Sequence, residues 1–292
     1  MTDENATGQP LYPLPYDDAP DTAVLDPESD ARDRPMSLGD HFEELRWRLM
    51  RCAAFFFPPF IAGLALYPWL WELALLPARR AARMLGEPME KLIVLRPEGP
   101  ADLVATVARW DAAVVALLLL PVWVYHLWMF LAPGLRAGEK AALKRILGSG
   151  SILFLAGAAT AYWWGAPLGL AFLLPFNQSL AAVENQWGVD GYLAFLQMVC
   201  LGFGLAFETP LAMWALARAG LLTTRALTRY WRHTVLAVVI LSAILTPPDP
   251  FTQLLMSAVI LLLMLAGAWL VRLGERQAAE AAGDSPFGRF GE

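Results

Sequence analysis

An all-α integral membrane protein is the fold class that the sequence predicts, because the chain is strongly apolar, sparsely charged and divided into apolar segments of helical length. Of its 292 residues, 57% are hydrophobic and 17% are charged, and the mean hydropathy is +0.46. Soluble domains carry about 25% charged residues, so a soluble core of this length would lack the charged surface needed to cover it. The same numbers exclude disorder of the whole chain. The net charge of −5 excludes a basic, phosphate-binding surface.

Six apolar segments approach the length of about 20 residues that a helix needs to cross a bilayer core of about 30 Å. We therefore expect six transmembrane helices, at about residues 50–70, 112–130, 151–173, 193–217, 235–246 and 254–271. The prolines in Pro247–Phe251 predict a tight turn between the last two segments. At about 1.5 Å per residue the fifth segment covers only about 18 Å, so the two final helices are expected to be short.

Prolines lie inside several of these segments, and each removes a backbone donor and kinks its helix. They are Pro58 with Pro59, Pro121, Pro167 and Pro210. Kinked helices that do not pack straight leave a concavity, so we expect a kinked bundle. Tryptophan and tyrosine residues near the span ends are typical of interfacial anchors; they are Tyr67, Trp69, Trp71, Trp187, Tyr192, Tyr230 and Trp231.

Lys and Arg residues predict the orientation of the chain. They occur before the first segment, between the second and third, between the fourth and fifth, and after the sixth. With six spans these positions share one side, so the positive-inside rule places both termini in the cytoplasm. The connection 73–109 conflicts with this assignment because it also carries Lys and Arg, including the pair Arg79 and Arg80, which we expect on a solvated helix face.

The membrane domain is expected over residues 36–275. Residues 1–35 hold repeated aspartates and prolines without the apolar core of a signal peptide, which predicts an acidic, disordered N-terminal tail. Residues 276–292 are expected to form a flexible cytoplasmic tail. Neither a disulfide, a metal site nor a cofactor is predicted, since Cys52 and Cys200 lie in separate apolar runs without a CxxC pair and the histidines are far apart.

Glu208 is the polar residue that most needs an explanation. It lies about 15 Å along its helix from Arg218, which places it near the middle of the bilayer. A carboxylate there should face water or a partner, or be protonated, because an isolated charge in the membrane is costly. One function that Glu208 alone would support is a proton-coupled small-molecule transporter. A third possibility, an intramembrane serine protease built on Gly148–Ser151, is not expected because no Asp accompanies His126 or His233.

Other polar residues have ordinary structural explanations as well as functional ones. Glu44 lies on an amphipathic helix at i,i+4 spacing from Arg48, which predicts a helix-face ion pair. Glu139 suits a helix N-terminus. The segment Thr246–Asp249 with Gln253 suits a capped turn. On spacing alone, these structural explanations are favoured.

Together these strings resemble one family, the TatC subunit of the twin-arginine protein translocase. The matching segments keep the family order and the resemblance covers roughly residues 36–275; they are His41–Arg46, Phe130–Glu139, Phe203–Pro210, and Thr246–Asp249 with Gln253. The chain departs from the family at Phe42, where a leucine is usual, and in the first external loop around Arg96–Pro100.

The resemblance implies a receptor rather than an enzyme, with a cupped, glove-like fold of six helices in the cytoplasmic (inner) membrane. It implies binding of the twin-arginine signal peptides of folded precursor proteins at the cytoplasmic face and transport driven by the proton-motive force. The implied partners are single-span TatA-like and TatB-like subunits and further copies of this chain.

The resemblance also implies roles for individual residues. Glu44 and Glu139 would contact the two arginines, with Arg46 and Phe130 beside them. Glu208 would be an intramembrane polar site. The docking line for partner helices would include Thr246, Asp249 and Gln253.

Overall fold

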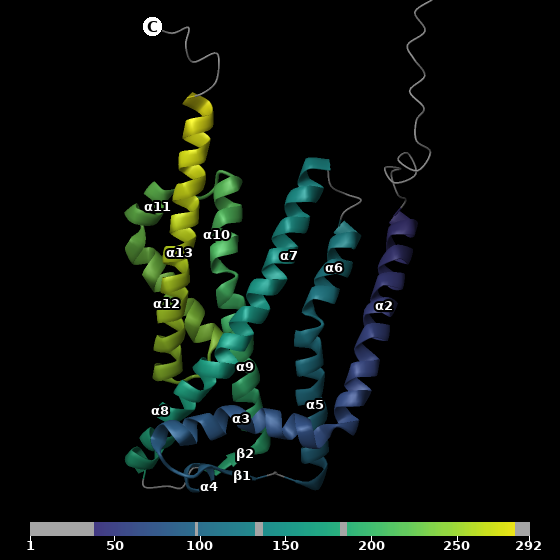
Figure 1. The fold of residues 1–292 in the computed structure, drawn as a ribbon, viewed down its shortest axis with the longest axis vertical. Helices are drawn as coiled ribbons and strands as arrows, with labels where there is room; N and C mark the ends of the chain where they lie inside the picture. Colours follow the sequence, from purple (N-terminus) through teal and green to yellow (C-terminus); the bar gives the residue numbers. More distant parts are fainter. Residues whose placement is uncertain (1–37, 97–98, 132–136, 182–185, 284–292) are drawn as a thin grey trace, which may run out of the picture. The chain divides into compact units, whose positions relative to one another are not determined.

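The computed structural model describes residues 38–96, 99–131, 137–181 and 186–283, which are almost entirely helical (Figure 1). The chain divides after Glu44 into two units, Met1–Glu44 and Leu45–Glu292. The elements in chain order are α2 (Leu38–Ala65), α3 (Tyr67–Leu85), α4 (Met89–Leu92), β1 (Val94–Arg96), α5 (Pro100–Leu118), α6 (Leu120–Leu131), α7 (Ala137–Thr160), the π-helix η2 (Ala161–Gly165), α8 (Ala166–Ala181), β2 (Gln186–Gly188), α9 (Val189–Phe207), α10 (Thr209–Arg218), α11 (Thr224–Arg229), α12 (Trp231–Leu245) and α13 (Pro250–Gly283).

Four helical stretches are long and apolar enough to cross a membrane, or up to five if a bent pair is taken as one span. The four are Phe42–Ala65, Ile146–Phe176, Val189–Arg218 and Pro250–Gln277. The bent pair joins Leu103–Leu118 to Leu120–Phe130 at 58°. The expected fifth span corresponds to α12, which has only 15 residues and extends about 22 Å, less than the thickness of a bilayer core.

The expectation of two short final helices is wrong for the second of them. Helix α13 has 34 residues and ends at Gly283, so residues 276–283, expected within a flexible tail, are helical. Arg272, Glu275 and Arg276 interrupt the apolar run, but Arg, Glu, Gln and Ala all favour helix, and the helix therefore continues after the apolar segment ends. Residues 1–35 and 284–292, the rest of the two expected tails, lie outside the described part of the chain.

The first span is also displaced from its expected bounds. Helix α2 ends at Ala65, and Tyr67 begins a second helix, α3, which the sequence pattern placed partly in the span and partly in a loop. Four small residues of α3 are buried, namely Ala74, Ala78, Ala81 and Ala82, and α3 packs against α8 and η2. The small side chains allow close packing, which periodicity of large apolar residues alone does not reveal.

Three of the expected proline positions coincide with breaks in the α-helical hydrogen-bond pattern. Pro121 follows the bend between α5 and α6, Pro167 follows the π-helix, and Pro210 follows the break at Glu208. Each break agrees with the loss of a backbone donor at proline. Pro58 and Pro59 differ, because α2 continues through both as one helix.

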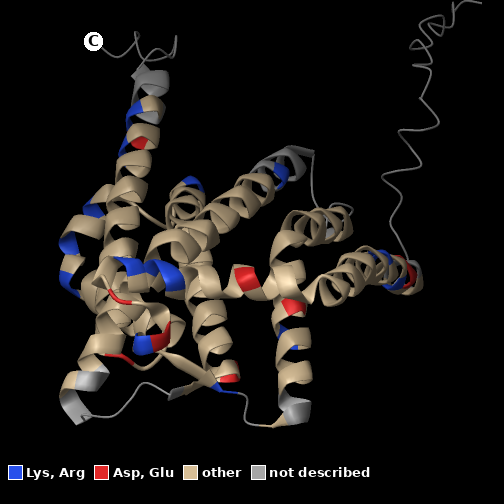
Figure 2. Ribbon diagram, turned by 60° about the horizontal axis from the view of Figure 1, so that its bottom comes forward, with Lys and Arg blue, Asp and Glu red and all other residues tan. Residues whose placement is uncertain are grey.

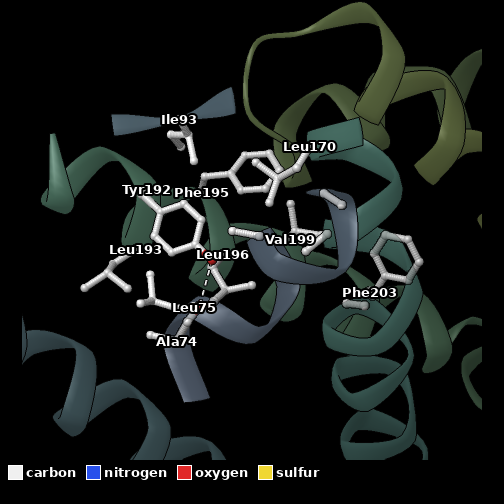
Figure 3. Packing of buried hydrophobic residues seen from close by; sticks show 14 of the residues in the cluster. Ala74, Leu75, Ile93, Leu170, Tyr192, Leu193, Phe195, Leu196, Val199 and Phe203 are labelled. Atoms are coloured by element: carbon white, nitrogen blue, oxygen red, sulfur yellow. Dashed lines mark hydrogen bonds between the residues drawn. The ribbon is translucent and has the colours of Figure 1, made fainter. Parts of the chain in front are cut away.

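The buried core of the second unit joins α3, α8 and α9 (Figure 3). Tyr192 lies at its centre and is fully buried, with its hydroxyl donating to the Ala74 carbonyl at 2.6 Å. Leu170 and Leu196 are equally buried nearby. The expectation that Tyr192 is an interfacial anchor is therefore wrong, whereas Tyr67 and Trp69 are exposed, as anchors are.

Two prolines leave backbone carbonyl groups without their usual helical donor. In each case a side chain from another helix donates to the carbonyl instead. Pro77 cannot donate to the Leu73 carbonyl four residues earlier, and the Tyr162 hydroxyl donates to that carbonyl at 2.7 Å. Pro167 likewise cannot donate to the Trp163 carbonyl, and Arg80 donates to it at 3.1 Å. The Arg80 guanidinium also lies 3.7 Å from the centroid of the Trp163 ring. We call this pair of bonds the carbonyl lock; it joins α3 to the junction of α7, η2 and α8.

A short parallel pairing departs from the all-α expectation. Strand β1 pairs with β2 in the register Val94 with Gln186, Leu95 with Trp187 and Arg96 with Gly188. The pairing ties the segment before α5 to the segment before α9. On the same side, Arg109 of α5 donates to Asp190 of α9 at 2.7 Å.

Candidate functional site

The residues expected to contact two arginines lie near helix ends. Glu44 is the last residue of the first unit and is half-buried, whereas Arg46 in the second unit is exposed. Phe130 is half-buried at the end of α6. Glu139 lies in the first turn of α7, as expected for a residue that favours a helix N-terminus, and its side chain lies outside the described part of the chain.

Helices α6 and α7 pack against each other and bring Phe130 and the backbone of Glu139 to the same end of the second unit (Figure 1). The Lys144 ammonium lies 5.5 Å from the centroid of the Trp128 ring and thus links the two helices near this end. This end of the α6–α7 pair therefore joins the aromatic residues of α6 to the first turn of α7, which contains Glu139.

Glu208 occupies the break between α9 and α10, within the span Val189–Arg218. Its side chain is half-buried and turned toward α7. A Cβ added at Gly150 would lie 3.0 Å from one Glu208 carboxylate oxygen and 3.4 Å from the other, so the glycine leaves room for the carboxylate. Among the residues that the structure describes, no ion pair involves Glu208.

The serines beside Gly150 are not arranged as nucleophiles. The Ser151 hydroxyl is buried and donates to the Leu147 carbonyl at 2.9 Å, and the Ser149 hydroxyl donates to the Ile146 carbonyl at 3.1 Å. Hydroxyls bonded back to the preceding turn in this way are typical of serines inside helices.

Thr246, Asp249 and Gln253 come together at the turn between α12 and α13. Thr246 is buried and donates to the Ser242 carbonyl at 2.8 Å. Asp249 accepts from the backbone of Thr252 at 2.7 Å and also from its hydroxyl, which makes it the cap of α13. Gln253 donates to the Val239 carbonyl at 3.4 Å.

One helical turn further on, the hydroxyls of Ser242 and Ser257 are 2.5 Å apart. This polar seam, formed by Ser242, Thr246, Asp249, Thr252, Gln253 and Ser257, holds the two final helices together. It has the capped turn that the spacing predicted, continued by side-chain bonds between the helices.

Asp111 is a buried acidic residue that the sequence analysis missed. It lies on α5 inside the bent span, is 0% exposed, and neither carboxylate oxygen has a hydrogen-bond partner in the described part of the chain. It packs against Gly63 of α2, where an added Cβ would meet the Asp111 carboxyl carbon at 2.6 Å. The sequence signal for Asp111 was an acidic residue directly before an apolar run. The second span was expected to begin at residue 112, so Asp111 was not considered as a residue of the membrane interior.

Arg79 and Arg80 were both expected on a solvated helix face, and only Arg79 meets this expectation. Arg79 forms an exposed ion pair with Glu72 on the same helix. This hydrogen bond holds the pKa of the Glu72 carboxyl below its usual value. Arg80 instead donates to the Trp163 carbonyl as part of the carbonyl lock. Within the described ranges, no group of three or more His, Cys, Asp or Glu side chains could hold a metal ion.

Long apolar helices that alternate with polar connections, with single acids set inside the spans, define an integral membrane protein that crosses the bilayer several times. Charged side chains are sparse in the middle of these helices (Figure 2). A family model described as "Sec-independent protein translocase protein (TatC)" matches residues 40–258. The chain belongs to this family, which serves protein transport and is not enzymatic.

The relatives agree with this assignment. The chain is 32% identical over 275 residues to the Sec-independent protein translocase protein TatC of Xylanimonas cellulosilytica, covering 92% of this chain and 97% of the relative. It is 30% identical over 245 residues to the chloroplastic TATC protein of Arabidopsis thaliana, covering 84% of this chain and 68% of the relative.

A solved structure is similar as well. The crystal structure titled as the twin arginine translocase receptor TatC has 28% identity and a TM-score of 0.60, and the match covers 80% of this chain and 98% of that one. The chain is therefore a membrane subunit of the twin-arginine translocation system, which works with other subunits.

Proposed function

We propose that this protein is the receptor of the translocase for twin-arginine signal peptides of folded precursor proteins. The observation that carries the proposal is the match, over 80% of the chain, to a crystal structure titled as a twin-arginine translocase receptor. The family match begins at residue 40 and therefore includes Glu44, Arg46, Phe130 and Glu139.

The chemistry of these residues suits a pair of arginines. Two guanidinium groups need two acceptors, and Glu44 and Glu139 supply two carboxylates. Arginine can bond a carboxylate through two parallel N–H donors, whereas a lysine ammonium acts as a compact point charge. Phe130 would provide apolar contact, and the resemblance makes Arg46 a further neighbour of the acids. A Lys-Lys leader should consequently bind more weakly than an Arg-Arg leader.

The proposed orientation has both termini in the cytoplasm of a bacterial cell, with the protein in the inner membrane. The distribution of Lys and Arg supports it, and the loops around Arg136–Arg145 and Arg218–Arg232 would then face the cytoplasm. In this orientation α3, α4, β1 and β2 lie at the extracytoplasmic end. Export would be driven by the proton-motive force.

We propose that the polar seam marks the docking line for single-span TatA-like and TatB-like subunits. Helix α12 is short and presents large exposed apolar side chains beside the seam, including Leu236, Ile240 and Ile244. A partner helix could cover these side chains and exchange hydrogen bonds with Thr246, Asp249 or Gln253. Polar groups strengthen helix association in lipid. Further copies of this chain would join the same receptor complex.

Signal-peptide binding by the complete receptor complex tests the main proposal. Glu44→Ala and Glu139→Ala should each weaken binding of an Arg-Arg peptide about fivefold, since an exposed ion pair contributes about 1 kcal/mol. Glu43→Ala is the matched control, because Glu43 is an exposed neighbour of Glu44 on the same helix. Photocrosslinking and binding isotherms in nanodiscs provide the measurement. Unchanged binding by the Glu44→Ala/Glu139→Ala double variant would contradict the proposal.

A proton-coupled small-molecule transporter using Glu208 is the alternative. The half-buried position of Glu208 within a span is the observation in its favour. Solute flux in proteoliposomes that lack the partner subunits, abolished by Glu208→Gln, would support it. Family membership favours protein transport instead.

A further inference from the structure

We infer that Asp111 is a proton-binding site on the extracytoplasmic side of the membrane domain, covered by helix α2. The inference rests on the proposed function for two points, the orientation that makes the α3 end extracytoplasmic and export driven by the proton-motive force. It concerns a residue outside the proposed peptide-binding and partner-binding sites.

Burial without a partner is the first observation. Asp111 is 0% exposed, and both of its carboxylate oxygens lack a hydrogen-bond partner within the described ranges. An ionised carboxylate in this position would carry the full cost of desolvation, whereas a neutral carboxylic acid avoids most of it. When α2 covers Asp111, its carboxyl group therefore holds a proton.

The second observation is that, among the described residues, no ion pair involves Asp111. The nearest arginine in sequence, Arg109, is bonded to Asp190 at 2.7 Å and to Thr106 at 3.1 Å. On α2, Arg51 lies about 18 Å along the helix from Gly63. The His126 ring of α6 neighbours Phe55, about 12 Å along α2 from Gly63.

These groups complete the charged and ionisable side chains on the elements around Asp111. Helix α9, which packs against α5, carries Asp190, Tyr192 and Cys200. The remaining groups are Asp102 on α5, Tyr125 on α6, and Asp40, His41, Glu43, Glu44, Arg46, Arg48 and Cys52 on α2.

The cover over Asp111 is the third observation. Gly63 allows the α2 backbone to approach the carboxyl group closely, yet no residue from 45 to 65 of α2 is buried. Moving α2 away from α5 therefore exposes little additional core. Separation at Gly63 would admit water to Asp111 and let it exchange its proton with the extracytoplasmic side. A proton gradient would thereby bias the packing of α2.

Infrared spectroscopy of the protein in nanodiscs tests the protonation directly. The wild type should show the C=O stretch of a protonated carboxylic acid at neutral pH, which Asp111→Asn removes and Glu72→Gln, a change at an exposed carboxylate that leaves the Arg109–Asp190 pair intact, retains. Gly63→Ala, which forces α2 away from the carboxyl group, should shift the loss of this band to lower pH. If Asp111→Asn fails to fold, the pH at which Gly63→Ala loses the band still tests the inference. A wild-type spectrum without the band, or one that Asp111→Asn leaves unchanged, would overturn the inference.

Transport by the complete translocase in vesicles gives the second readout. Asp111→Asn should bind an Arg-Arg signal peptide with wild-type affinity but lose the response of transport to an imposed pH gradient. An Asp111→Asn variant that keeps the full response would refute the coupling. Peptide binding by the Glu44 and Glu139 variants is measured without a pH gradient and tests only the proposed receptor function. Failure of that proposal can therefore be distinguished from failure of the inference about Asp111.

Discussion

At the scale of single residues, the interior depends on side chains that satisfy particular carbonyl groups. The Tyr192 hydroxyl donates to the Ala74 carbonyl, and the Tyr162 hydroxyl and Arg80 complete the carbonyl lock. The Tyr192 bond is buried, whereas the two bonds of the carbonyl lock lie at exposed positions. A hydrogen bond in an apolar interior is stronger than an exposed one, so we expect the Tyr192 bond to contribute the most.

Tyr192→Phe tests this point because it removes only the hydroxyl. We expect the free energy of unfolding to fall by about 0.5–1.5 kcal/mol, since the phenyl ring keeps its packing while the hydrogen bond to the Ala74 carbonyl is lost. Tyr67→Phe is the control, because Tyr67 is 57% exposed. Thermal unfolding in detergent measures both. Equal stability of Tyr192→Phe and wild type would show that the bond contributes nothing.

The Glu72–Arg79 pair predicts a dependence on pH. In the folded protein, the hydrogen bond from Arg79 lowers the pKa of the Glu72 carboxyl group below its usual value of 4.5. The pair therefore stabilises the fold above about pH 4.5, and the benefit is lost as the pH falls through the lower, folded-state pKa. Glu72→Gln should differ from wild type at neutral pH and low salt, and converge with it in acid or high salt, in thermal scans. A difference that persists in acid would contradict an electrostatic origin.

At the scale of elements, glycines set how closely the long helices approach one another. A Cβ added at Gly157 of α7 would lie 2.5 Å from the Phe203 carbonyl oxygen of α9. A Cβ at Gly202 would lie 2.6 Å from the Leu245 carbonyl oxygen of α12. Both contacts are with backbone, which cannot move aside as the end of a flexible side chain can. Close approach of this kind is a common basis of helix packing in membranes.

Gly157→Ala should therefore destabilise the protein by about 1–3 kcal/mol, as overpacking does. Gly148→Ala, on the same helix, is the matched control, because a Cβ there meets nothing within 4 Å and alanine favours helix. Detergent-resistant unfolding midpoints of the two variants provide the comparison. The prediction fails if both variants are equally stable.

At the scale of the whole molecule, the sequence predicted the membrane class, the approximate helices and the turn at Pro247–Phe251. Apolar run length and proline carry this information directly. The sequence did not predict α3 as a packed helix, because its contacts use alanines rather than a periodic stripe of large side chains. It also missed the continuation of α13, since a hydropathy window ends where charges begin although a helix need not.

The candidate site was predicted unevenly for a similar reason. Glu208 was recognised as an acid inside an apolar segment, and the three residues at the α12–α13 turn by their capping pattern and by the resemblance. The structure places Thr246, Asp249 and Gln253 together. Asp111 belongs to no motif of the resemblance, and its importance arises from Gly63, 48 positions earlier in the chain. Such a long-range contact cannot be recognised from local spacing. The roles of Glu44, Glu139, Arg46 and Phe130 stay predictions for the binding experiment.

The carbonyl lock has a consequence for biogenesis. Helix α3 leaves the ribosome well before Tyr162 has been synthesised, so the Leu73 carbonyl cannot yet meet the hydroxyl that satisfies it. The newly made α3 must wait in a provisional position, with water or lipid headgroups as its neighbours, until α7 and η2 have been inserted. Completion of this end of the protein is therefore a late step of assembly, and nascent chains that stop before Tyr162 should be the forms that quality-control proteases recognise and remove.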